Sequence, residues 1–137
     1  MSSLSSSQLT ELLGLMPFSE GLGVKLENAD PSTVAGTLAW SAERCTSDGI
    51  LHGGAIMALA DSVGAICAYL NLPEGATTST IESKTNFFRG VRSGFVRATA
   101  KPVHIGNRTI VVQTDLLDEE DRSVALVIQT QAVLGRA

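Results

Sequence analysis

Aromatic residues and cysteines are scarce in this chain of 137 residues, which has one Trp, one Tyr, four Phe and two Cys. Cys45 and Cys67 are too few for a disulfide scaffold, so the fold must rest on an apolar core. Hydrophobic residues at 44% and charged residues at 18% are typical of a globular protein. We therefore expect a single domain over residues 1–137, with the serine-rich residues 1–7 frayed, and a cytoplasmic location.

An excess of positive charge and a long hydrophobic run are also missing. The net charge is −4 and the sequence pI is about 5.0, which argues against a nucleic-acid-binding surface. The longest apolar stretch, residues 54–70, is interrupted by Asp61 and is short for a membrane span. The first residues lack the basic region and apolar core of a signal peptide. We expect no nucleic-acid and no membrane partner.

Patterns that bind metals are lacking too. His52, His104 and the two cysteines match no known zinc-ligand spacing, so we expect no metal site. A thiolate nucleophile formed by Cys45 and His52 is disfavoured, because Cys45 lies well before the start of the next predicted helix. Ser62 lacks the Gly-x-Ser-x-Gly context of a serine hydrolase.

One carboxylate stands out in what is present. Between residues 54 and 70, only Asp61, Ser62 and Tyr69 carry polar side-chain atoms, so this segment predicts a helix buried in a core. A buried, unpaired carboxylate is costly, and Asp61 lies two turns past the Gly53-Gly54 pair, too far to cap the helix. Chemistry is the leading explanation for Asp61, and a structural hydrogen bond to a neighbouring loop is the alternative.

The remaining periodicity predicts mostly strands. A helix is expected over 5–16, ended by Pro17, followed by strands over 21–29 and 33–42 and a loop over 43–53. Four strands are expected after the apolar helix, and their short links favour antiparallel neighbours; they cover residues 77–88, 93–105, 108–118 and 122–133. This order predicts an α+β fold with one antiparallel sheet around one apolar helix, whose uncovered surface a dimer would bury.

Four short segments carry a family resemblance. They are residues 49–55 (GILHGGA), 59–62 (LADS), 80–87 (TIESKTNF) and 104–108 (HIGNR). Together they resemble the signature of hotdog-fold acyl-CoA thioesterases, closest to the phenylacetic-acid-degradation (PaaI-like) type. The resemblance covers roughly residues 17–134 and implies a helix wrapped by a sheet. It also implies a homo-oligomer, a dimer joined sheet edge to sheet edge or a dimer of dimers.

The resemblance also implies roles for individual residues. The Gly53 N–H would polarise the thioester carbonyl, and Asp61 would act as general base or nucleophile. His52 and Gly54 would shape the turn before the helix. Thr80, with Ser79 beside it, would assist the carboxylate or its water. Free N–H groups at a helix start suit this chemistry, because the carbonyl becomes an oxyanion during hydrolysis.

One position departs from the family pattern. Relatives usually carry Asn or Gln six residues before the histidine, where this chain has Thr46. Threonine is shorter and lacks the amide donor, which leaves the rate, the substrate or the activity itself open. The alternative to an acyl-CoA thioesterase is therefore an acyl-CoA-binding hotdog protein with little or no turnover. A hotdog dehydratase or hydratase is disfavoured, because the His-containing motifs of those relatives are not present.

Spacing along the helix adds an inference about assembly. Gly53 and Asp61 are eight residues apart, or about 12 Å along a helix axis, so one chain cannot easily place both groups on one carbonyl. Two antiparallel helices across a dimer can, which predicts a site shared by two chains. The resemblance implies that the CoA path is lined by Gly54, Asn86, Phe87, Arg89, Gly106 and Arg108. Whether these charges are simply solvated, whether CoA or acyl carrier protein is the carrier, and which acyl group is bound stay open. No cofactor is expected.

Overall fold

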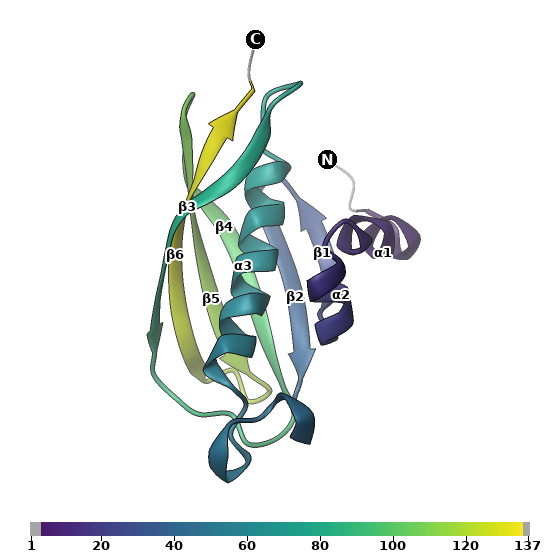
Figure 1. Cartoon of the computed structure of the whole chain (residues 1–137), viewed down its shortest axis with the longest axis vertical. Helices are drawn as coiled ribbons and strands as arrows, with labels where there is room; N and C mark the ends of the chain where they lie inside the picture. The colour runs from purple at the N-terminus through teal and green to yellow at the C-terminus, as the bar shows by residue number, and fades with distance from the viewer. Residues whose placement is uncertain (1–3, 136–137) are drawn as a thin grey trace.

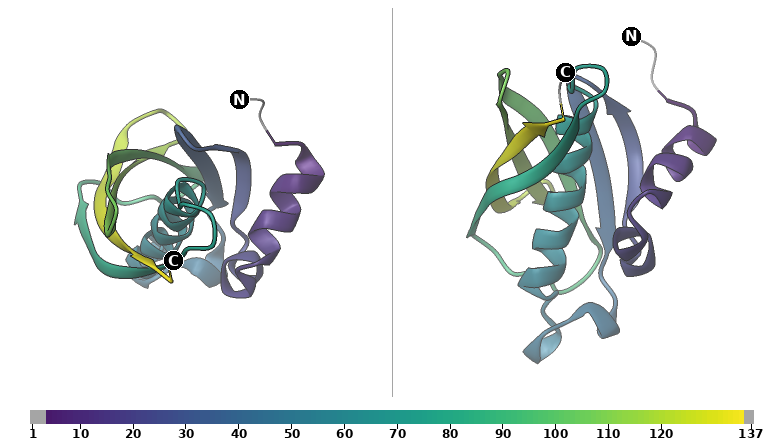
Figure 2. Two further views of the ribbon diagram at one scale, coloured as in Figure 1. Left: turned by 90° about the horizontal axis from the view of Figure 1, so that it is seen from above. Right: turned by 45° about the horizontal axis from the view of Figure 1, so that its top comes forward.

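The computed structural model describes residues 4–135 and consists of one curved sheet around one long helix. The six strands are antiparallel and lie in the order β1-β2-β4-β5-β6-β3. Their bounds are β1 (Lys25–Asp30), β2 (Thr33–Ala39), β3 (Thr77–Phe87), β4 (Phe95–Ile105), β5 (Thr109–Asp118) and β6 (Ser123–Leu134). Helix α3 (Gly53–Tyr69) lies in the concave side of the sheet (Figures 1 and 2). The hotdog arrangement expected from the sequence is confirmed.

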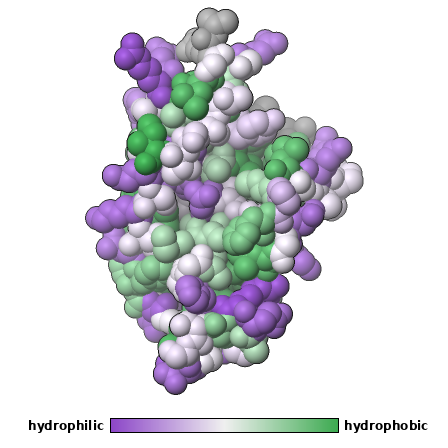
Figure 3. Space-filling view, viewed as in Figure 1, coloured by the Kyte–Doolittle hydropathy of each residue, from purple (hydrophilic) through white to green (hydrophobic). Residues whose placement is uncertain are grey.

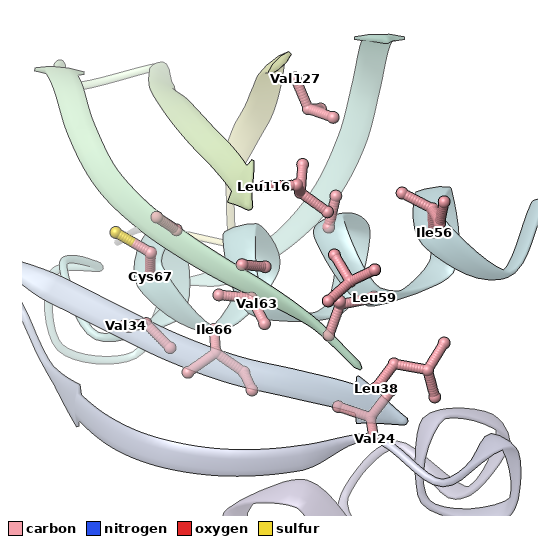
Figure 4. Close-up of a cluster of buried hydrophobic side chains, with 14 of the residues drawn as sticks. Val24, Val34, Leu38, Ile56, Leu59, Val63, Ile66, Cys67, Leu116 and Val127 are labelled. Carbon is pink, nitrogen blue, oxygen red and sulfur yellow. The ribbon is translucent and has the colours of Figure 1, made fainter. Parts of the chain in front are cut away.

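The core fills the space between α3 and the sheet. Leu59 and Val63 of α3 are fully buried among Val34 and Leu38 of β2 and Leu116 of β5 (Figure 4). Strand β4 contributes one face to this core. Its side chains alternate between buried and outward-facing positions over residues 95–100. The buried set is Val96, Ala98 and Ala100, and the outward set is Arg97, Thr99 and Lys101.

The prediction that α3 is buried on nearly all sides is wrong for one face. Met57 (42% exposed), Asp61, Ala65 and Tyr69 (51% exposed) follow one another at four-residue spacing and form an open stripe. The sheet curves around only part of the helix (Figure 2), and this stripe lies along the side of α3 that the chain leaves open, next to the edge strand β3. Apolar side chains gather beside polar ones over the open side of the molecule (Figure 3). Asp61 is therefore not enclosed by its own chain.

The N-terminal part differs most from expectation. Helix α1 (Ser6–Gly14) is held by a capping box of Ser5 and Gln8, so residues 4–7 are ordered, and residues 1–3 lie outside the described part. Pro17 follows α1 as expected, but it also starts a second helix, α2 (Pro17–Leu22), because proline fits the first helical position. The strand predicted from residue 21 consequently starts only at Lys25.

The expectation that each strand after α3 pairs with the next one in the chain is wrong for β3 and β4. Strand β3 pairs with β6, so it lies at a sheet edge and not beside β4. Residues 88–94 cross the end of the sheet instead of forming a hairpin. Seven residues span up to about 23 Å, more than the roughly 14 Å between strands three places apart. The later links, β4 to β5 and β5 to β6, do join neighbours.

Within residues 4–135, no helix combines the length and apolar character needed to cross a membrane.

Candidate active site

The Asp61 carboxylate lies at the middle of α3, facing two polar groups from the sheet. Gln129 of β6 donates a hydrogen bond from Nε2 to Asp61 Oδ1 at 3.4 Å. Partial removal from water raises the pKa of Asp61, and hydrogen bonds from Thr80 and Gln129 oppose this rise. The net direction, which the sequence left open, is therefore upward. A carboxylate of raised pKa on an open helix face has the character of a general base.

Thr80 reaches Asp61 because of an irregularity in the sheet. The register between β3 and β6 shifts between Thr80 and Glu82, which leaves Ile81 as a bulge. Thr80 lies directly opposite Gln131, whose Nε2 donates to the Thr80 hydroxyl at 2.8 Å. Ser79 is the neighbouring residue on β3 and is exposed.

The start of α3 leaves one backbone donor free. His52 caps the helix, and its Nδ1 accepts a hydrogen bond from the Gly54 N–H at 2.8 Å. The N–H groups of Ala55 and Ile56 bond to the His52 carbonyl. Among the residues that the structure describes, the Gly53 N–H has no acceptor, so it is the donor that the helix offers to a ligand.

Phe87 lies beside Gly53 at the helix start. Its ring would be 3.2 Å from a Cβ placed on Gly53, so the absence of a side chain at Gly53 leaves room for the ring. Phe87 is 49% exposed and Asn86 beside it is also exposed, both at the end of β3. The sequence placed these residues near the CoA path without showing that Phe87 contacts the helix start.

The loop before α3 is anchored at several points. It contains two short 3-10 helices, η1 (Ala42–Arg44) and η2 (Ser47–Gly49), where the sequence predicted only a loop. Trp40 Nε1 donates to the Gly49 carbonyl at 2.9 Å, and the His52 N–H bonds to the Arg44 carbonyl at 2.8 Å. Thr46 precedes η2, is exposed and does not cap it with its side chain. The anchored loop fixes His52 and places Thr46 near the same end of α3.

The candidate CoA contacts fall at opposite ends of the chain's sheet. Arg89 is exposed just after β3, near the end where α3 starts. It lines a surface cavity of about 460 Å³ together with Arg92 and Arg122, and three carboxylates of residues 118–120 line the same cavity and balance the three arginines. Gly106 and Arg108 form the turn between β4 and β5, at the end of the sheet where α3 finishes (Figure 1). One chain therefore does not bring these groups together.

Gly53 and Asp61 are likewise apart. Both belong to one continuous helix, so eight residues separate them by about 12 Å along its axis.

Two residues of the site were missed by sequence reasoning. Gln129 and Gln131 are 0% and 1% exposed, and both point from β6 toward the Asp61 region. Their signal was available, since two glutamines at alternate positions interrupt a strand that is otherwise apolar.

Comparison with known proteins identifies the family of the chain. The family model of the thioesterase superfamily matches residues 48–125, more than half of the chain, which includes Gly53, Asp61 and Thr80. The 1,4-dihydroxy-2-naphthoyl-CoA hydrolase of Escherichia coli is 32% identical over 113 residues, covering 82% of this chain and 83% of the relative.

Solved structures show the same fold. A thioesterase of Haemophilus influenzae superposes with a TM-score of 0.88 and 28% identity, covering 98% of this chain and 93% of the other. The PaaI protein of the Escherichia coli phenylacetic acid degradation operon superposes with a TM-score of 0.82 over 95% of this chain and 94% of its own. Its identity is 20%, so it supports the fold alone. The chain thus belongs to the thioesterase superfamily and is a hotdog-fold thioester hydrolase.

Proposed function

We propose that this protein hydrolyses an acyl-CoA to the free acid and CoA at a site shared by two chains. Asp61 of one chain activates water or attacks the carbonyl, and the Gly53 N–H of the other chain stabilises the oxyanion. Thr80 holds the water or the carboxylate, and His52 orients the helix start. The observation that carries the proposal is that one apolar helix presents both a free N–H donor at its start and an open carboxylate at its middle.

The separation of the two groups supports a dimer. A carbonyl about 3 Å from both groups cannot be reached within one chain when they are about 12 Å apart. The open stripe of α3 and the edge strand β3, which carries Ile81 at 62% exposure, offer apolar surface for a second chain. Two antiparallel α3 helices would place Gly53 of each beside Asp61 of the other. They would also bring Arg89 of one chain toward Arg108 of its partner.

Two observations bear on the acyl group. The Escherichia coli relative is named for an aromatic acyl-CoA, and its match covers 82% of this chain. An apolar cavity of about 250 Å³ lies further along the open stripe, and it is lined by Leu12, Leu15, Met16, Ala65, Ile66, Tyr69 and Thr78. Its apolar lining favours an aromatic or a short-to-medium aliphatic acyl chain.

The two cysteines, Cys45 and Cys67, are free thiols in the structure. Free thiols fit a reducing compartment, and we infer a cytoplasmic location on this ground.

Thiol release from a panel of acyl-CoAs tests the proposal. The panel runs from acetyl to palmitoyl and includes phenylacetyl, benzoyl and hydroxynaphthoyl esters, with wild type measured beside Asp61→Asn. We expect turnover by the wild type and a loss of kcat of about two orders of magnitude or more in Asp61→Asn, with the melting temperature preserved. Near-normal turnover by Asp61→Asn would exclude Asp61 from the chemistry.

The threonine at position 46 favours a second candidate function, which is acyl-CoA binding with little turnover. If the exposed Thr46 cannot hold the nucleophilic water that an amide would hold, the chain would bind acyl-CoA with little turnover. Calorimetric binding of acyl-CoA without thiol release, and activity gained by Thr46→Asn, would favour that function.

A further inference from the structure

Strand β6 carries two fully buried glutamines at positions where an apolar residue would stabilise the core more. Gln129 and Gln131 occupy the face of β6 that packs toward α3, in register with buried Val112 and Ile110 of β5. Burying an amide is costly unless all its polar atoms are bonded. Each glutamine nevertheless directs its Nε2 toward the Asp61 region, one to Asp61 itself and one to Thr80.

We propose that Gln129 and Gln131 are positioning residues that hold the Asp61 carboxylate and the Thr80 hydroxyl in the arrangement needed for hydrolysis. This rests on the proposed role of Asp61 as the base. Gln129 acts directly, by donating to Asp61 Oδ1 at 3.4 Å. Gln131 acts through Thr80, to which it donates at 2.8 Å while its own Oε1 accepts from the Thr78 hydroxyl at 3.1 Å.

The side-chain amide of Gln129 is fixed in one orientation, with its nitrogen toward Asp61 and its oxygen toward Gly64. Its Oε1 has no hydrogen-bond partner among the described residues, and it faces Gly64 of α3, where a Cβ would overlap it. A rotated amide would direct this oxygen at the carboxylate, which repels it. The helix thus keeps a glycine where Gln129 needs space, and β6 keeps an amide whose carbonyl is unsatisfied. Both features lower stability, which is the pattern expected of residues retained for function.

Among residues 4–135, no charged group competes with the two amides for Asp61. Asp61 is the only charged residue of α3, and β6 has none. Burial raises the pKa of Asp61, and the hydrogen bonds from Thr80 and Gln129 lower it. The charged and titratable residues on the other elements packed against α3 are not among these causes; they are Glu20, Lys25, Glu27, Asp30, Glu82, Lys84, Arg97, Lys101, His104, Asp115 and Asp118.

The test replaces each amide by a side chain of similar length that cannot donate. In Gln129→Met, we expect kcat to fall about tenfold or more while KM changes little, because the lost bond is to a charged group. Losing this donor raises the pKa of Asp61 further, so the acid limb of the kcat/KM profile should move to higher pH. The melting temperature should not fall, since an unsatisfied carbonyl is removed.

Gln113→Met is the matched control, because Gln113 lies on β5 in register with Ile128 and faces away from α3. It should leave the limb and kcat unchanged. Gln131→Met and Thr80→Val should move the limb in the same direction as Gln129→Met, and Thr80 is exposed enough that its replacement does not threaten folding. A limb at the wild-type position in both glutamine variants overturns the proposal, whatever happens to kcat and whatever Thr80→Val does. The proposed function would fail differently, by turnover that survives Asp61→Asn.

Discussion

The helix start offers a ligand a single donor, and its neighbours determine which one. His52 takes the Gly54 N–H with its imidazole, and its carbonyl takes those of Ala55 and Ile56. The Gly53 N–H is left free at the positive end of a helix of 17 residues. Because the donor is a backbone group, only a change that removes the N–H itself can test it.

Gly53→Pro makes that change with little damage to the helix. Proline is favoured at the first helical position, and His52 already has the φ of −60° and ψ of 130° that a residue before proline adopts. We expect kcat to fall about a hundredfold or more in a thiol-release assay, with helix content by circular dichroism unchanged. Gly53→Ala is the control, because it adds a Cβ against Phe87 but keeps the donor. Equal losses in both variants would contradict the oxyanion role of this N–H.

His52 can be tested for proton transfer separately from capping. In His52→Asn the new side chain still caps the helix, so kcat should stay within a few-fold of wild type and the free energy of unfolding should change little. His52→Ala removes the cap and should lower the free energy of unfolding by about 1 kcal/mol, measured by urea titration. If His52→Asn loses turnover as completely as Asp61→Asn, the imidazole takes part in the chemistry and the orienting role is wrong.

The sequence identified these residues because their signals are local. Asp61 is conspicuous in an apolar helix, and His52-Gly53-Gly54 marks a helix start whatever the rest of the fold is. Gln129 and Gln131 lie 68 and 51 residues from the groups they contact, Asp61 and Thr80. The pairing of β6 with β3 brings Gln131 to Thr80, and the packing of α3 against β6 brings Gln129 to Asp61. Neither arrangement was predicted in detail, and the pairing of β6 with β3 was missed.

Among the elements, α3 was predicted to within one residue at each end. The expected helix over residues 54–70 became Gly53–Tyr69, because the apolar run, the glycines and Pro73 agree on its limits. Residues 17–24 were misread because a proline can follow one helix and begin the next. The neighbours of β3 were misread because a short link permits a hairpin but does not require one.

Gly64 of α3 provides a prediction at this scale. Alanine in place of a mid-helix glycine normally stabilises a helix by about 1 kcal/mol. In Gly64→Ala the new Cβ would overlap Gln129, so we expect a loss of about 1–3 kcal/mol instead, measured by urea denaturation. In the Gln129→Ala background the same change should stabilise the protein, because the obstructing amide is gone. Equal effects in both backgrounds would show that Gly64 and Gln129 do not interact.

At the scale of the whole molecule, the shared site predicts complementation between two inactive variants. If each site takes Gly53 from one chain and Asp61 from the other, a heterodimer of Gly53→Pro and Asp61→Asn contains one intact site and one with both defects. Refolding an equimolar mixture should therefore restore about a quarter of wild-type turnover, measured by thiol release. Each variant refolded alone is the control. A mixture no more active than its components would mean that each site lies within one chain.

The bulge at Ile81 also determines to which face of the sheet each later side chain of β3 points. Thr80 meets Asp61 and Phe87 lies against Gly53, so both point toward α3, yet they are seven residues apart and strict alternation would turn them to opposite faces. The bulge shifts the count by one, and it places Ser83 rather than Glu82 opposite the inward-facing Gln129. Without it, either Thr80 would turn outward, or Phe87 would leave the helix start and the Glu82 carboxylate would face Asp61. One inserted residue thus lets β3 reach both ends of the proposed active site, where a regular strand could reach only one.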